Sequence, residues 1–230
     1  MSEDLSALKD FCGTARLFPL PNLVLFPYVI QPLHIFEPRY RQMTADALED
    51  DRLIAPVLLQ PGWEADYEGQ PAIHSITCVG RIIAEQGLSD GRYNLLLRGL
   101  SRARIIEELP KTKLYRSARV ELQPEGDPPN ESAARDMVRS IAESTRRWFP
   151  PEGTATEQME KLLRSQLPLG LLCDLLAFAV PLAVEAKQQL LEQLDIEKRA
   201  HLLVEHLQQG ELPKPASKTD RLFPPNFSSN

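Results

Sequence analysis

The chain has 230 residues, of which 43% are hydrophobic and 25% are charged, with a formal net charge of −6 and a pI of about 5.4. This is the composition of a soluble globular protein with enough residues for one large domain or two small ones. The acidic balance argues against broad nucleic-acid binding and leaves a local basic patch open.

The cysteines and the N-terminus indicate a reducing compartment. Cys12, Cys78 and Cys173 are far apart and odd in number, which favours reduced, buried thiols over a disulfide framework. The first ten residues, MSEDLSALKD, lack the positive segment and apolar core of a secretory signal. No uninterrupted apolar run approaches the roughly 20 residues of a membrane helix. We therefore expect a cytoplasmic protein with no membrane partner.

The first apolar run, Leu17 to Pro27, reads LFPLPNLVLFP and contains three prolines. Proline has no amide hydrogen for a sheet ladder, so this run cannot be a central strand that is fully paired on both sides. The pattern predicts an extended apolar segment at the edge of a sheet.

From Leu17 to about Pro124 the sequence is typical of an antiparallel sheet or barrel. Short apolar runs bounded by Gly, Pro, Asp or Ser occupy residues 23–26, 33–36, 53–60, 77–86, 92–99, 103–109 and 115–122. Asp90-Gly91 suits the positive φ angles of a tight turn and predicts that 77–86 pairs with 92–98.

Two other segments interrupt these runs. A helix is predicted after Pro38, because an apolar stripe at helical spacing contains Tyr40, Met43, Ala47 and Leu48. Residues 61–71, PGWEADYEGQP, read as a long, polar and mobile loop.

After residues 126–131, GDPPNE, the hydrophobic period changes to 3.6. One helix is predicted from Ala134 to Trp148, closed by Pro150-Pro151, and a second from a capping box at Thr154 and Glu157 through Leu167. The nearly all-apolar segment 169–180 is expected in the centre of a bundle. Further helices are predicted over Val184–Leu194 and Ile196–Leu207, with Asp195 as a cap.

Together these patterns predict an α+β protein in four parts. We expect an N-terminal extension at 1–14, a β-rich subdomain at 15–124, a helical bundle at 125–209 and a disordered tail at 210–230. The tail contains RLFPPN at 221–226, which echoes RLFPLPN at 16–22. Chance similarity and competition of the tail for the site of the N-terminal run are both open.

The sequence predicts no catalytic residue, cofactor or metal ligand. Residues 87–91, GLSDG, match the G-x-S-x-G elbow, but a strand follows where the elbow needs a helix, so Ser89 is interpreted as a turn residue. No glycine is directly followed by lysine, which excludes a phosphate-binding P-loop. His201 and His206 fall on different helix faces, and no other ligand completes a metal set.

Two binding surfaces are candidates. Aromatic residues gather around the proline-rich run, at Phe18, Phe26, Tyr28, Phe36 and Tyr40. An exposed apolar patch beside an open sheet edge suits capture of an extended polypeptide. The residues predicted to make these contacts are Leu23, Leu25, Phe26, Tyr28, Ile35 and Phe36. The alternative is a basic stripe for an anion or nucleic acid, formed by residues of equal parity, Arg92, Arg98, Arg102 and Arg104.

Several blocks, in order, resemble the N-terminal substrate-binding (LON) domain of Lon proteases. They are RLFPLPNLVLFPYVIQPLHIFEPRYRQM, CVGRI, LSDGRYNLLLRGLSRARI and LLCDLLAFAVPLAVEAKQQLLEQLDIEKRAHLLVEHL, and they cover about residues 15 to 208. The resemblance implies a PUA-like β subdomain followed by a helical one, and a role in recognising unfolded or damaged polypeptides.

A full Lon protease continues into a coiled coil, an ATPase module and a serine-lysine protease domain, whereas this chain stops at Asn230. We therefore expect a free-standing, non-catalytic member that binds apolar segments, as an adaptor or regulator with a protease or chaperone as partner. Because PUA-like folds resemble RNA-binding modules, binding of RNA or another anionic ligand is the alternative.

Overall fold

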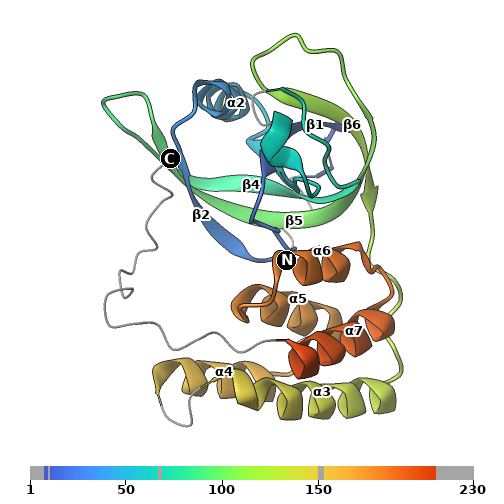
Figure 1. Cartoon of the computed structure of the whole chain (residues 1–230). Helices are drawn as coiled ribbons and strands as arrows, with labels where there is room; N and C mark the ends of the chain where they lie inside the picture. The colour runs from blue at the N-terminus through green and yellow to red at the C-terminus, as the bar shows by residue number, and fades with distance from the viewer. Residues whose placement is uncertain (1–7, 10, 67–68, 150–152, 211–230) are drawn as a thin grey trace.

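A β-rich part and a helical part are stacked in the computed structural model, which describes residues 8–9, 11–66, 69–149 and 153–210 (Figure 1). The predicted tail with its RLFPPN segment lies outside the described residues, as do most of the predicted N-terminal extension and the Pro150-Pro151 stop. None of the helices in these four ranges has both the length and the apolar character needed to span a bilayer.

The strands of the β-rich part form one sheet that closes on itself. They are β1 (Thr14–Leu20), β2 (Ile30–Ile35), β3 (Leu53–Leu58), β4 (Ile76–Gly87), β5 (Tyr93–Glu108) and β6 (Arg116–Gln123). The order is β2-β5-β4-β3-β1-β6, and β5 also pairs with β6, so five strands make a closed barrel and β2 is attached to its outside. Only β1 and β3 are parallel among these pairs.

Strand β5 is 16 residues long, so it can pair both with β2 outside the barrel and with β6 in the barrel wall. Its first part pairs with β2, from Tyr93–Ile35 to Arg98–Ile30, and its last part pairs with β6. The predicted hairpin is confirmed, since β4 pairs with β5 along its length and Gly91 has a φ of 80°. The runs predicted at 92–99 and 103–109 are one strand, with a register shift opposite at Val79/Gly80.

The prediction that Leu17–Pro27 is not fully paired on both sides is confirmed, but its strand is not the edge strand of the sheet. Strand β1 pairs with β6 over Thr14–Leu17 and with β3 over Leu17–Leu20, so it lies inside the barrel wall. The two pairings are staggered, and Pro19 falls where β3 is the ladder partner. Pro21 and Pro27 lie beyond the end of the strand, where they remove no ladder hydrogen bond.

The helices follow the predicted 3.6-residue periods. They are α2 (Pro38–Glu49), α3 (Glu131–Thr145), α4 (Thr154–Arg164), α5 (Leu169–Ala179), α6 (Val184–Glu192) and α7 (Ile196–Gln209), with 3-10 turns η1 (Trp63–Asp66) and η2 (Arg146–Trp148). Helix α2 covers the barrel through Tyr40, Met43 and Ala47, as predicted. Turn η1 falls inside the segment predicted as a polar loop.

The predicted caps have different outcomes. Asp195 caps α7 by accepting a hydrogen bond from the backbone nitrogen of Lys198 at 3.0 Å, which confirms the prediction. The capping box at Thr154 was wrong, because Thr154 is the first helical residue and Gly153 holds the cap position without a side chain. The helix also ends at Arg164, earlier than the predicted Leu167.

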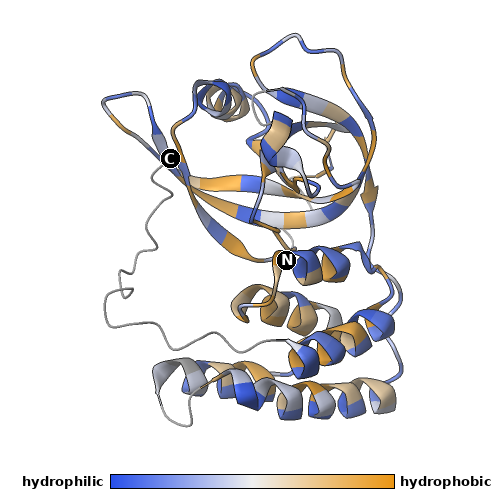
Figure 2. Ribbon diagram, in the orientation of Figure 1, coloured by the Kyte–Doolittle hydropathy of each residue, from blue (hydrophilic) through white to orange (hydrophobic). Residues whose placement is uncertain are grey.

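One hydrophobic core spans the barrel and the helices, and a second fills the other part of the barrel. Helix α5 and the strands carry much of the hydrophobic colour in Figure 2. Cys78 and Cys173 belong to the first core, and burial raises the pKa of each thiol to about 12. Cys12 is exposed, which corrects the prediction that all three thiols are buried.

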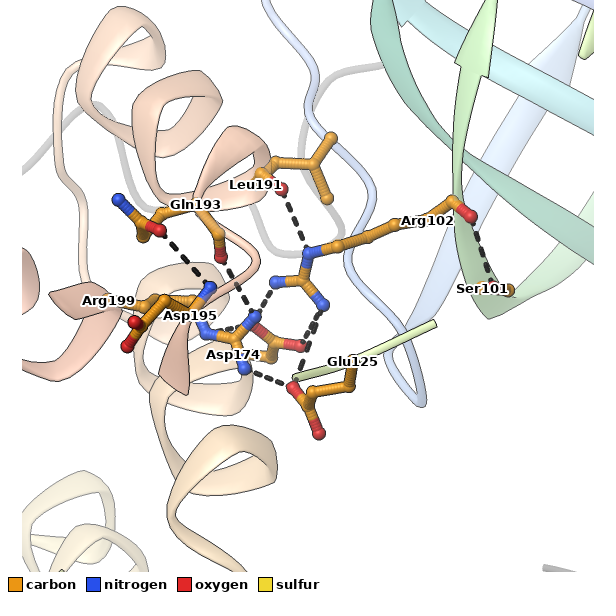
Figure 3. Close-up of polar contacts among 8 residues, drawn as sticks. All are labelled: Ser101, Arg102, Glu125, Asp174, Leu191, Gln193, Asp195 and Arg199. Carbon is orange, nitrogen blue, oxygen red and sulfur yellow. Dashed lines mark hydrogen bonds and ion pairs between the residues drawn. The ribbon is translucent and has the colours of Figure 1, made fainter. Parts of the chain in front are cut away.

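A buried ionic network joins the two parts (Figure 3). Arg102 of β5 donates to both carboxylate oxygens of Asp174 on α5, at 3.0 and 2.6 Å, and its Nε donates to the carbonyl of Leu191 at 2.9 Å. The side chains of Arg102 and Asp174 are 3% and 2% exposed. Arg199 of α7 adds an ion pair to Asp174 at 3.6 Å and a hydrogen bond to Glu125.

The electrostatics of Arg102 show why it stays charged in this position. Burial by itself would lower its pKa, but the charge and hydrogen bonds of Asp174 outweigh burial, and the net pKa is raised. Two guanidinium groups and two carboxylates meet here, so the network has no formal net charge. Removing one partner of the buried Arg102–Asp174 pair would leave the other charge buried and incompletely compensated, which is strongly destabilising.

We expect Asp174→Ala to lower the free energy of unfolding by roughly 3–5 kcal/mol, because it leaves the buried Arg102 and Arg199 with only the carboxylate of Glu125 between them. Asp136→Ala is the matched control, since its pair with Arg139 is exposed and should contribute at most about 1 kcal/mol. Urea unfolding measures both. Equal losses in the two variants would contradict the structural role of the network.

His206 of α7 should make stability depend on pH. Its Nε2 atom is buried and has no hydrogen-bond partner among the described residues, and burial lowers its pKa from 6.5. The unfolded chain then binds a proton more readily than the folded one, so stability falls as pH decreases through the unfolded value of about 6.5. His206→Leu should flatten this part of the profile, measured as melting temperature from pH 8 to 5. An unchanged slope would refute the assignment.

Candidate functional site

The six residues predicted as polypeptide contacts have different environments. Leu25, Phe26 and Ile35 are buried in the first core, at 1%, 0% and 1% exposure. Leu23 and Phe36 are half-buried, and Tyr28 is 39% exposed. In this conformation Tyr28 offers the largest contact surface of the set, while the three buried side chains stabilise the fold.

An apolar surface that the sequence reasoning missed lies on the outside of β2, β5 and β4. Its large members are Ile30 at 46% exposure, Ile83 at 44% and Leu96 at 39%. Leu96 lies opposite Pro32 on β2 and opposite Ala84 on β4, and both of these are exposed. We call these residues the outer apolar face: Ile30, Pro32, Ile83, Ala84 and Leu96.

The sequence contained a signal for this surface. Leu95, Leu96 and Leu97 are consecutive in a strand, so at least one of the three must face away from the core. The irregularity between Ile82 and Ala84 places Ile83 in a bulge, where it stays exposed. This second feature depends on the pairing register, and the sequence alone does not give it.

Beside this surface, β2 presents an open edge, since it ends the sheet order in the described part of the chain. The carbonyl of Val29 accepts a hydrogen bond from the amide of Gly99 at 2.9 Å. Bonding alternates along an antiparallel ladder, so Gln31, Leu33 and Ile35 face β5. The backbone groups of Ile30, Pro32 and His34 consequently point to the open edge, where Pro32 has no amide hydrogen.

The turn that leads into β2 is strained and tightly held. Tyr28 has a φ of 65°, a left-handed conformation that is costly for a residue with a large side chain. Its amide donates to the carbonyl of Gly99 at 2.8 Å. A Cβ atom on Gly99 would lie 2.0 Å from the carbonyl oxygen of Phe26, so only glycine permits this close approach.

A cavity of about 350 Å³ lies beside this turn. Its apolar walls come from the chain before β1, the turn, β5, β6 and the segment after β6: Leu8, Pro27, Tyr28, Leu100, Leu122 and Pro124. Arg102 and Glu125 of the buried network also line it. We call it the Tyr28 cavity. Another cavity of about 460 Å³ lies between α3 and α4, against Phe149, Met159 and Leu163.

The arginines of the predicted basic stripe do not share one open face. Arg92 donates to Asp90 at 2.6 Å, and this hydrogen bond lowers the pKa of the carboxyl group to about 2. Arg102 is buried against Asp174, while Arg104 is exposed. The shift in register near Gly99 breaks the common parity of the four residues.

The motif around Ser89 is a hairpin turn, as predicted. The amide of Leu88 donates to the carbonyl of Arg92 at 2.8 Å, and that of Gly91 donates to Leu88 at 2.9 Å. Strand β5 follows, so the helix that an elbow requires is not present at this position. In the described ranges, no three His, Cys, Asp or Glu side chains are grouped so that they could hold a metal ion.

Curated relatives are Lon proteases. The chain is 26% identical over 217 residues to "Lon protease" of Anaeromyxobacter dehalogenans, and 28% identical over 217 residues to "Lon protease 2" of Myxococcus xanthus. Each alignment covers 92% of this chain but 25% and 26% of the relative. The chain thus spans about a quarter of the length of these proteins.

Solved structures share the fold. The N-terminal domain of the Mycobacterium avium complex Lon protease matches with a TM-score of 0.67 and 16% identity, over 86% of this chain and 100% of that one. A Lon N-terminal domain protein from Xanthomonas campestris matches with a TM-score of 0.61 and 22% identity, over 84% and 97%.

The family profile described as "ATP-dependent protease La (LON) substrate-binding domain" matches residues 14–209. The matched region is distinct from the ATPase and protease domains of Lon, and no catalytic domain is evident in it. The chain belongs to the family of LON substrate-binding domains.

Proposed function

We propose that the protein is a non-catalytic polypeptide-binding module that holds exposed apolar segments of unfolded or damaged proteins. The observation that carries this proposal is the outer apolar face beside the open edge of β2, where Ile30 and Leu96 are 46% and 39% exposed. Membership of a substrate-binding family supports it. An extended segment gains backbone hydrogen bonds at the edge and apolar contacts on the face.

The arrangement predicts weak and tolerant binding. The edge offers amides at Ile30 and His34 with a gap at Pro32, so an added strand forms an incomplete ladder. The outer apolar face is small, and ordering an unfolded segment costs free energy. Modest affinity for many sequences follows, which suits an adaptor or regulator that passes clients to a protease or chaperone.

The pairing of the basic stripe argues against the alternative of RNA or another anionic ligand. Arg92 and Arg102 already hold carboxylates, at 2.6 Å in each pair. Phosphate contacts would make affinity fall steeply with salt. Apolar contacts would make it nearly independent of salt between low and physiological ionic strength.

We expect the double variant Ile30→Ser/Leu96→Ser to bind a permanently unfolded protein, reduced and carboxymethylated lactalbumin, about tenfold more weakly, or about 1.4 kcal/mol. Because both side chains are exposed, folding stability should change by no more than about 1 kcal/mol. Fluorescence anisotropy of the labelled probe measures the affinity.

Ile106→Ser is the control for this experiment. Ile106 is 49% exposed on the same strand as Leu96, but it lies in the part of β5 that pairs with β6. Its substitution should leave the affinity unchanged. Equal affinity of the double variant and the wild type would refute the outer apolar face as the binding site.

A further inference from the structure

The Tyr28 cavity lies at the beginning of the open edge, because Tyr28 precedes the first residue of β2 by two positions. A strand advances about 3.3 Å per residue, so a segment laid along β2 reaches the cavity within two or three residues of Ile30. We propose that the Tyr28 cavity is the specificity pocket of the polypeptide site, which takes one large apolar side chain of the bound segment with a basic residue next to it. This inference rests on the proposed function and adds which polypeptide segments are preferred, namely those with a large apolar residue next to a basic one.

The size and walls of the cavity fit an apolar side chain. A volume of about 350 Å³ lies at the lower end of the range for ligand pockets, roughly 300–1,000 Å³. The apolar walls are the rings of Pro27, Tyr28 and Pro124 and the side chains of Leu8, Leu100 and Leu122. The cavity is therefore a place where a side chain of the client can be enclosed.

The polar lining offers one exposed hydrogen-bond acceptor to a cationic donor. Arg102 is saturated by Asp174, so the cavity offers no free guanidinium to an anion. Glu125 is different, because its side chain is 38% exposed. Both arginine contacts of Glu125 are made to Oε1, and Oε2 points away from them (Figure 3). This oxygen can accept a hydrogen bond from a lysine or arginine of the client.

The strain at Tyr28 is the second argument. Asparagine or glycine would adopt a φ of 65° at lower cost than tyrosine. Backbone strain that the surrounding structure maintains is concentrated at binding and catalytic sites. Here the two hydrogen bonds between the turn and Gly99 hold the conformation and place the Tyr28 ring on the cavity wall.

The test uses the full chain, its variant Tyr28→Asn and two peptides of alternating valine and threonine. One peptide carries a Phe-Arg pair near one end, and the other has Ala-Arg at the same place. Tyr28→Asn should bind the Phe-Arg peptide about tenfold more weakly and the Ala-Arg peptide as the wild type does. Its melting temperature should stay equal or rise, because asparagine relieves the strained φ.

A second variant tests the charge. Glu125→Gln keeps an acceptor for Arg199 and removes the negative charge, so it should erase the preference of the wild type for Phe-Arg over a Phe-Gln peptide. Leu114→Ser, at a residue that is 56% exposed and outside the cavity, is the control that should change nothing.

The two proposals fail in distinguishable ways. If Tyr28→Asn binds both peptides like the wild type while Ile30→Ser/Leu96→Ser weakens binding, the cavity inference is overturned and the proposed function stands. A wild-type preference for Phe-Arg that persists in Glu125→Gln overturns the selection of a basic residue. If the wild type binds neither peptide nor unfolded lactalbumin, the proposed function itself is refuted.

Discussion

The ion pair between Arg102 and Asp174 is the contact on which the arrangement of the molecule depends. It joins β5, the strand that pairs with β2, β4 and β6, to α5, the most apolar helix of the bundle. Hydrophobic contact alone is non-directional and would allow the bundle to rotate against the barrel. A bidentate pair with 2.6 and 3.0 Å hydrogen bonds fixes one orientation. Arg102 also lines the Tyr28 cavity, so the pair holds this part of the cavity wall in place.

The closure of the barrel explains where the exposed surface lies. Strand β5 is long enough to bind β6 with one part and β2 with another. The barrel is complete without β2, which therefore has one neighbour in the described chain and leaves an edge open. The outer apolar face lies beside this edge, and its residues Ile30 and Leu96 stay 46% and 39% exposed.

Local patterns in the sequence predicted much of the fold. The Asp90-Gly91 turn, the helix after Pro38 and the Asp195 cap depend on residues close in sequence, and all three are confirmed. The position of Leu17–Pro27 was not predictable in this way. Prolines limit the pairing of a strand, but they do not show whether one neighbour pairs with its first part and another with its last part, as β6 and β3 do with β1.

The same distinction applies to the candidate site. Tyr28 was identified from the sequence, and its exposure agrees with a contact residue. Leu25 and Phe26 were chosen with it because they lie in the apolar run just before it, yet both are buried, and a left-handed turn at Tyr28 separates them from β2. Ile30, Ile83 and Leu96 come from three strands, and their proximity follows from pairing register, which a single sequence does not display.

Pro32 has a consequence for the behaviour of the protein in concentrated solution. The open edge of a sheet can pair with the same edge of a second copy of the chain, and such pairing can nucleate aggregates. When two β2 edges pair, each strand lacks one amide hydrogen, so two donors are missing from the ladder. When β2 pairs with a client strand that has no proline, only one donor is missing. Pro32 therefore weakens the pairing of two β2 edges more than the pairing of β2 with a client strand. This limits aggregation while the apolar surface stays open to clients.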